Sequence, residues 1–307
     1  MPLPPLAKPK SLPVNLWRLC KGSFIFTFLS VLLLLCNIVQ CLTSPLLLIS
    51  RKLVRVMNRY IGGFWWGTCD LCAEYLWKIN VKITGDPLPL RENVMVTVNH
   101  QDMADITTLF RLARRQKRIG DLKWFVKDMI KYVPGIGWGM IFLDCIFVKR
   151  NWKKDKERLN KQLSRFEIDQ IPIWTLSFVE GTRLRPHKLE QSQVYAQQQG
   201  VEPHQHLLIP RTKGFCLTLG ALRTHLDAVY DATIGYVDGV PTLWQWCRGD
   251  VSHVNVHVRR FAISEVPVLE EELSQWLKDR WYEKDQLLDG FYQTGQWPTL
   301  HDQPQSK

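Results

Sequence analysis

The chain has 307 residues, of which 46% are apolar, so its composition excludes a disordered protein and leaves room for a large buried core. Its net charge is +11, from 40 Lys and Arg against 29 Asp and Glu. This surplus indicates an anionic partner (a nucleic acid, a membrane surface or a phosphorylated ligand) or only a soluble surface. The eight cysteines show no paired framework and fit reduced thiols. Cys69 and Cys72 lack the second pair that a zinc site needs, so we expect no metal.

Residues 1–22 are basic and begin with a proline-rich stretch, and we expect them to be disordered. Residues 22–50 contain no charged side chain. As a helix this run would be about 43 Å long, more than the roughly 30 Å that the core of a bilayer requires. It is too long for a signal peptide, and a buried helix of a soluble protein is the weaker alternative, so we expect a membrane segment. Basic residues flank the run on both sides, which leaves a spanning helix and a re-entrant or in-plane helix open.

The next stretch, RYIGGFWWGTCDLCAEYLW, is rich in Trp and Tyr and has only two acidic residues. Amphipathic aromatic rings beside a membrane segment are typical of the interface between lipid and water. The two stretches together predict a membrane-seated hairpin of two helices over residues 23–78. A domain boundary near Lys78 follows.

After Lys78 the pattern changes to strands that alternate with helices, which predicts an α/β layer fold. The continuous apolar runs VMVTV and IWTLSF suit strands that are buried on both faces. No later run is long or apolar enough to be a second membrane span. We expect strands at 79–84, 94–98, 171–178, 206–209, 228–237 and 253–261, and helices at 105–117, 124–131, 154–166, 213–226 and 270–292.

The strand expected at 94–98 is followed by NHQDMAD, in which Asp105 comes five residues after His100. On one continuous helix the two side chains would be about 140° apart, so they can meet only if the chain turns and Asp105 opens the next helix. A carboxylate bonded to one ring nitrogen leaves the other nitrogen free to take a proton from a hydroxyl. Because no serine accompanies the pair, the nucleophile would be an alcohol of the substrate. The alternative is a hydrogen-bonded surface histidine beside a helix-capping aspartate.

Three further apolar runs end in basic residues, within IFVKRNW, SFVEGTRLRP and LLIPRTKGF. A glycine at such an end lets the backbone approach a ligand, and hydroxyl and guanidinium groups suit phosphate oxygens. Beside a His-Asp pair, these ends predict an anion-binding active site; solvated turns are the alternative. The residues concerned are Lys149 and Arg150; Glu180, Gly181, Thr182 and Arg183; and Pro210, Arg211 and Lys213.

The segments NHQDMAD, FVKR, FVEGTR and IPRTKGF resemble, in order and spacing, the four motif blocks of the glycerolipid acyltransferases. The chain is most similar to the 1-acyl-sn-glycerol-3-phosphate acyltransferases and to their lysophosphatidylglycerol and lysophosphatidylinositol relatives. VKDMIKYVPGIGW and RWYEKDQLLDGFYQTGQWP also resemble stretches of this family, and the similarity covers roughly residues 50–298. It implies a mixed sheet flanked by helices over residues 79–298, with a tail at 299–307.

The resemblance also implies the reaction: transfer of a fatty acyl chain from acyl-CoA to the free hydroxyl of a lysophospholipid. The expected acceptor is 1-acyl-sn-glycerol-3-phosphate, which gives phosphatidic acid, and other lysophospholipids are the runner-up. His100 would be the general base, Asp105 its partner, and Lys127 a donor to the thioester oxyanion. For the acceptor's phosphate, the resemblance assigns Arg150 and Arg183, helped by Glu180, Gly181 and Thr182 in shaping the loop. For the acyl or acceptor groove, it assigns Pro210 and Lys213.

No cofactor or metal is implied, because a thioester is already activated. The implied partners are acyl-CoA, a lysophospholipid and the bilayer, and not nucleic acid. The active site would lie near the cytoplasmic face, of the endoplasmic reticulum in a eukaryote or of the inner membrane in a bacterium. The chain has neither the G-x-S-x-G of an α/β-hydrolase nor a P-loop. The alternative outside enzymes is a membrane-surface scaffold whose basic face binds anionic lipid.

Overall fold

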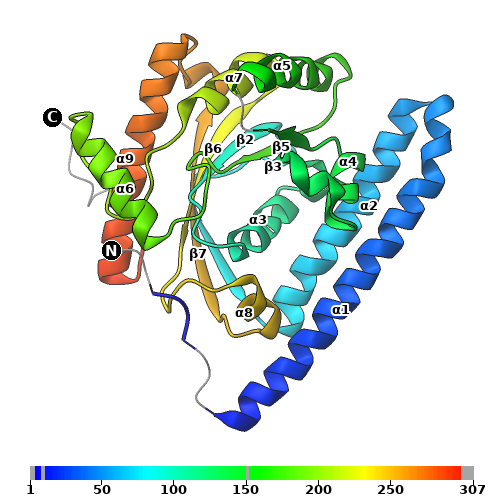
Figure 1. The fold of residues 1–307 in the computed structure, drawn as a ribbon, viewed down its shortest axis with the longest axis horizontal. Coiled ribbons are helices and arrows are strands. Elements are labelled where there is room, and N and C mark those ends of the chain that lie inside the picture. The colour runs from blue at the N-terminus through cyan, green and yellow to red at the C-terminus, as the bar shows by residue number, and fades with distance from the viewer. Residues whose placement is uncertain (1–3, 8–10, 150–151, 299–307) are drawn as a thin grey trace.

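The computed structural model describes residues 4–7, 11–149 and 152–298 (Figure 1). Its described residues form one seven-stranded sheet in the order β1-β7-β6-β2-β5-β3-β4. The neighbouring strands are parallel except for β6 and β7, so the expected α/β fold with a mixed sheet is confirmed. The strands are β1 (Asn80–Gly85), β2 (Val94–Val98), β3 (Leu122–Lys127), β4 (Ile146–Val148), β5 (Trp174–Ser177), β6 (Ala228–Gly235) and β7 (His253–Ala262).

Helices cover both faces of the sheet, and each face has its own apolar core (Figure 1). One core packs against α2, α3 and α8, and the other against α5, α7 and α9. The helices that follow β2 are α3 (Ala104–Arg115), α4 (Ile136–Phe142), α5 (Trp152–Ile168), α6 (Pro186–Gln198), α7 (Thr212–Leu222), α8 (Leu243–Arg248) and α9 (Glu270–Thr294). Short turns of 3-10 helix lie at η3 (Ile119–Asp121), η4 (Asp128–Tyr132) and η5 (Ile263–Glu265).

Strand β2 lies at the centre of the sheet, between β5 and β6. All five of its residues are buried, as the run VMVTV predicted. Because side chains alternate along a strand, Val94, Val96 and Val98 enter one core while Met95 enters the other. The strand that leads to His100 is therefore fixed from both sides.

The N-terminal hairpin consists of α1 (Leu12–Thr43), the 3-10 turn η1 (Ser44–Leu48), α2 (Arg51–Leu71) and the π-helical turn η2 (Cys72–Leu76). The helices α1 and α2 lie side by side at one edge of the molecule (Figure 1). Within the described residues, Leu12–Leu48 is the single helical stretch long and apolar enough to cross a membrane, by length and composition. Buried ion pairs from Asp70 to Arg111 and Arg114 fasten α2 to α3.

The expected disorder of residues 1–22 is wrong for residues 12–22, because α1 begins at Leu12. Pro13 stands in the first turn, where its missing N–H costs nothing. Farther along the helix, Arg18 forms an ion pair 3.1 Å from Asp250, so the start of α1 is held by the α/β domain.

Two expected elements are wrong. Residues 124–131 do not form one helix: Leu122–Lys127 is strand β3, whose aromatic and β-branched residues pair with β5 and β4, and only the 3-10 turn η4 follows it. Residues 206–209 are not a strand. Their backbone N–H groups donate to side-chain carboxylates instead of to a neighbouring strand. The N–H of His206 donates to Asp285 at 2.7 Å, and that of Leu208 donates to Glu180 at 3.0 Å. Helices α4, α6 and α8 were not expected.

Candidate active site

The site lies at one edge of the sheet because five parallel strands end there. Strands β2, β3, β4, β5 and β6 run in the same direction, so the residues that follow them meet at the same edge. His100 follows β2, Glu180 follows β5 and Tyr236 follows β6. In open α/β sheets this carboxyl edge is where ligands bind.

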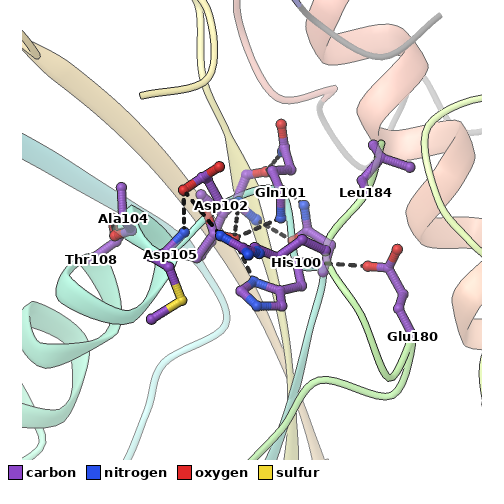
Figure 2. A network of polar contacts seen from close by, with 12 residues as sticks. His100, Gln101, Asp102, Ala104, Asp105, Thr108, Glu180 and Leu184 are labelled. Carbon is purple, nitrogen blue, oxygen red and sulfur yellow. Dashed lines mark hydrogen bonds and ion pairs between the residues drawn. The ribbon is translucent and has the colours of Figure 1, made fainter. Parts of the chain in front are cut away.

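The structure brings His100 and Asp105 together, with Nδ1 of the imidazole 3.0 Å from Oδ2 of the carboxylate (Figure 2). The same Oδ2 accepts hydrogen bonds from the backbone N–H of Gln101, at 2.6 Å, and of Asp102, at 2.9 Å. Asp105 lies in the first turn of α3, so the chain turns between strand and helix as the spacing predicted. The contact confirms the predicted geometry of the pair.

Tyr236 is a member of this network that the sequence did not reveal. Its hydroxyl donates to Oδ1 of Asp105 at 2.7 Å. Burial, together with the neighbouring carboxylate, raises the pKa of Tyr236 far above its ordinary value, so the phenol remains a donor. The carboxylate of Asp105, which is fully buried, thus accepts its hydrogen bonds from the imidazole, two amides and one phenol.

The imidazole of His100 is held on its flat face as well as at Nδ1. The ring of Phe178 stacks on it, with the ring centroids 4.0 Å apart and the planes 25° apart. The backbone carbonyl of His100 accepts from the N–H of Leu184 at 2.7 Å. Within the described residues no hydrogen bond is formed by Nε2, and His100 lines the large cavity described below. This nitrogen is therefore placed to take a proton from a ligand in the cavity.

Glu180 joins the two loops beside the histidine. Its carboxylate accepts from the N–H of His100 at 2.8 Å and from the N–H of Leu208 at 3.0 Å. The residue is 2% exposed, and burial raises the pKa of its carboxyl to about 8 against the pull of these two donors. A buried acid whose oxygens accept from the backbone of both loops holds these loops together.

Gly181 lets a guanidinium group approach the loop that follows β5. Its backbone has φ +70°, which favours glycine, and a Cβ there would lie 2.9 Å from Nε of Arg211. Beside it, Thr182 accepts a hydrogen bond from Nζ of Lys188. Arg183 is half exposed, and its Nη1 lies 3.9 Å from Oδ1 of Asp102. These groups form a basic rim close to His100.

Asp102 also holds Arg185, an arginine that the sequence analysis did not assign to the site. Nη2 of Arg185 donates to its Oδ2 at 2.6 Å, and Nη1 of Arg185 donates to the carbonyl of Gln101 at 2.9 Å. The first acid of NHQDMAD, Asp102, thus orients arginines, whereas the second, Asp105, orients the histidine.

Of the other predicted residues, Lys127 and Lys213 are exposed, Pro210 is buried, and all three line the same cavity as His100. Lys127 ends β3, and Lys213 lies in the first turn of α7. Arg150, also expected at the site, lies outside the described residues.

The cavity has a volume of about 2170 Å³, larger than the roughly 300–1000 Å³ of a pocket for one small ligand. One part is apolar and reaches the hairpin, with Leu33, Trp65 and Trp66 in its wall. Another part passes the basic rim and reaches Lys278 on α9. A space of this size, apolar at one end and cationic beside the histidine, suits an amphipathic anionic ligand.

Comparison with known proteins places the chain in a family. The model of the family described as Acyltransferase matches residues 80–219, and that described as Acyltransferase C-terminus matches residues 246–307. The 1-acyl-sn-glycerol-3-phosphate acyltransferase delta of Pongo abelii is 30% identical over 285 residues, which cover 91% of this chain and 75% of that protein. The probable 1-acyl-sn-glycerol-3-phosphate acyltransferase 5 of Arabidopsis thaliana is 33% identical over 250 residues, 81% of this chain.

The chain covers 66% of that Arabidopsis protein and 66% of lysocardiolipin acyltransferase 1 of Danio rerio, to which it is 30% identical over 254 residues. Among solved structures, the 1-acyl-sn-glycerophosphate acyltransferase PlsC of Thermotoga maritima matches 89% of this chain and 99% of its own, with a TM-score of 0.47 and 14% identity. The extent of the similarity to the curated relatives decides the family: the chain belongs to the acyltransferase family that includes the eukaryotic 1-acyl-sn-glycerol-3-phosphate acyltransferases.

Proposed function

We propose that the protein transfers a fatty acyl chain from acyl-CoA to the free hydroxyl of a lysophospholipid, with 1-acyl-sn-glycerol-3-phosphate as the acceptor and phosphatidic acid as the product. The observation that carries the proposal is the buried His100–Asp105 pair, with its second ring nitrogen at a cavity that is apolar at one end and basic beside the histidine. Membership of the acyltransferase family supports the same reaction class.

In the proposed mechanism, Nε2 of His100 takes the proton of the acceptor hydroxyl while the oxygen attacks the carbonyl carbon of the thioester. Asp105 holds the Nδ1 proton and stabilises the imidazolium that forms. When the tetrahedral intermediate collapses, the C–S bond breaks and the sulfur of CoA takes the proton back from the imidazolium. The ester is formed and the enzyme returns to its initial state.

The cations of the cavity have two tasks in this mechanism. Lys127 is the donor that would stabilise the oxyanion of the intermediate. Arg183 would bind the phosphate of the acceptor, and the exposed guanidinium of Arg211 above Gly181 is suited to share that charge. The apolar part of the cavity beside the hairpin would hold an acyl chain.

The hairpin provides the membrane seat in this proposal. α1 has exposed apolar side chains along most of its length, and such a surface is stable in lipid rather than in water. Substrates that carry long acyl chains would then reach the cavity from the bilayer, because the hairpin forms part of its wall.

A second acceptor class has support of its own. One relative is named a lysocardiolipin acyltransferase, and the cavity is large enough for a bulky headgroup. Lysophosphatidic acid, lysophosphatidylglycerol, lysophosphatidylinositol and lysocardiolipin all carry a phosphate beside the glycerol, so the basic rim alone does not distinguish them.

The test is to measure CoA release by purified protein in liposomes with each of these four acceptors. We expect turnover with at least one acceptor and a loss of at least about 100-fold in His100→Ala, the scale of general-base catalysis. His187→Ala, at an exposed histidine in the first turn of α6, is the matched control and should keep full activity. Folded wild-type protein that binds anionic lipid but releases CoA only at background with every acceptor would instead be the scaffold.

A further inference from the structure

In the segment formed by η4 and α4, residues 128–142, glycines are buried and large apolar side chains are exposed, which is the reverse of the usual arrangement. In the run PGIGWGM, the glycines at 135, 137 and 139 are buried. The large side chains between and around them face outward. The exposed fractions are 77% for Met129, 72% for Tyr132, 43% for Val133, 44% for Ile136, 43% for Trp138 and 49% for Ile141. A segment that folded against water alone would show the opposite arrangement.

The buried glycines let this segment lie directly against α1. A Cβ at Gly135 would lie 3.1 Å from Cδ2 of Leu33, and one at Gly139 would lie 3.5 Å from Nδ2 of Asn37. Both contact points fall in the middle of residues 22–50, the run of α1 and η1 that has no charged side chain. The segment therefore sits at the depth at which α1 is most apolar, next to the hairpin (Figure 1).

The outward face of this segment continues the outward face of α1. On α1 at this level, Val31 is 50% exposed, Leu35 is 52% exposed and Ile38 is 54% exposed. Two of the exposed side chains of the segment, Tyr132 and Trp138, are of the kind that gathers where lipid meets water. Nζ of Lys131 lies 5.0 Å from the ring centroid of Tyr132 and donates to Oδ2 of Asp128 at 2.9 Å.

We propose that residues 128–142 are a third membrane-contacting element, which inserts Tyr132, Trp138 and Ile141 among the lipid chains of the bilayer beside α1, while Val133 and Ile136 line the cavity of the site. The occupant of this surface is the phospholipid bilayer, because the surface is continuous with α1 and lies at the same depth. The inference rests on the membrane seat of the proposed function and extends it from the hairpin to the α/β domain. Because β3 leads directly into η4, the element would also fix the height of Lys127 relative to the lipid surface.

The test places the photo-crosslinking amino acid p-benzoylphenylalanine at position 138, and separately at position 141, in the full chain reconstituted into phosphatidylcholine vesicles. Position 35 on α1 is the reference for lipid contact. Position 268, where Val268 is 71% exposed just before α9, is the reference for an exposed apolar residue away from the hairpin (Figure 1). Mass spectrometry then measures covalent lipid adducts after illumination, and each variant must retain CoA release.

We expect lipid adducts at 35, 138 and 141 to exceed those at 268 by at least about tenfold, the ratio that burial of one apolar side chain implies. Labelling at 35 without labelling at 138 and 141 would overturn the inference and leave the membrane seat of α1 standing. Crosslinks from 138 and 141 to a second copy of the chain in place of lipid would also overturn it. No adducts at any position in active protein would refute the membrane seat itself.

Discussion

The hydroxyl of Tyr236 and Oδ1 of Asp105 lie 2.7 Å apart, and this contact joins the end of β6 to the first turn of α3. It occupies the carboxylate oxygen that does not contact His100. The position of the histidine therefore depends on a residue that lies 131 positions after Asp105 in the chain.

Tyr236→Phe should lower kcat about tenfold, because hydrogen bonds to charged groups contribute roughly 1.5–3 kcal/mol and only part of this acts through His100. With one donor fewer, the carboxylate attracts the imidazole proton more strongly, so the acidic limb of the pH–rate profile should move to higher pH. The measurement is kcat/KM from pH 5 to 9. Tyr230→Phe is the control: Tyr230 lies on β6, the strand that Tyr236 follows, but its hydroxyl donates to Glu92. A profile that does not move in Tyr236→Phe would contradict the positioning role.

Gly181→Ala should raise the KM for the lysophospholipid several-fold, because the added Cβ would displace Arg211. The control is Gly200→Ala: Gly200 has a similar φ of +66° but nothing within 4 Å of its Cβ position. Both variants should lose about 1 kcal/mol of stability from the left-handed backbone, and only Gly181→Ala should change KM. Equal KM values in the two variants would show that Arg211 does not bind the acceptor.

Glu180 should make the protein less stable as pH rises from about 5 to 8. The pKa of its carboxyl is about 8 in the folded state against 4.5 ordinarily, so in this window the folded state holds a proton that the unfolded state has lost. The contribution of this group to the free energy of unfolding therefore decreases as pH rises, by at most about 1.4 kcal/mol per pH unit. We expect the Tm of the wild type in detergent to fall more steeply across this window than that of Glu180→Gln. Parallel curves would mean that the carboxyl is already ionised at pH 5.

Asp70→Asn should destabilise the attachment of the hairpin by about 3–5 kcal/mol, because it leaves the buried Arg111 without its main partner. Asp144→Asn is the control: the ion pair of Asp144 with Arg55 is partly exposed on both sides, so its loss should cost less than about 1 kcal/mol. Thermal unfolding in detergent measures both variants. A similar small loss in each would show that the Asp70 network does not hold α2 on α3.

Local sequence patterns predicted a strand in which every residue has the same environment. VMVTV reads as a strand buried on both faces, and it is one, because a central parallel strand needs apolar residues throughout. The five-residue spacing of His100 and Asp105 predicted the turn between them for a similar reason: only a strand, a turn and a helix allow the contact.

Local sequence patterns gave a wrong prediction where a side chain, and not a neighbouring strand, accepts the hydrogen bonds of the backbone. Residues 206–209 have the composition of a strand, but the carboxylates of Glu180 and Asp285 satisfy their backbone. Such partners are distant in sequence, so no local window contains them. In the run 124–131, short apolar stretches of strand and helix look alike, and pairing with β5 decides in favour of the strand.

By itself, the sequence determined that a membrane-compatible apolar helix precedes an α/β domain and that a histidine stands five residues before an aspartate, because periodicity and spacing are local properties. Only the tertiary structure decided that the hydroxyl of Tyr236 donates to Asp105 and that Glu180 joins two loops. It also decided that the glycines of α4 are buried while its large side chains are exposed. These contacts join strands, loops and helices that are adjacent in space but distant along the chain, and the order in which strands enter the sheet brings them together.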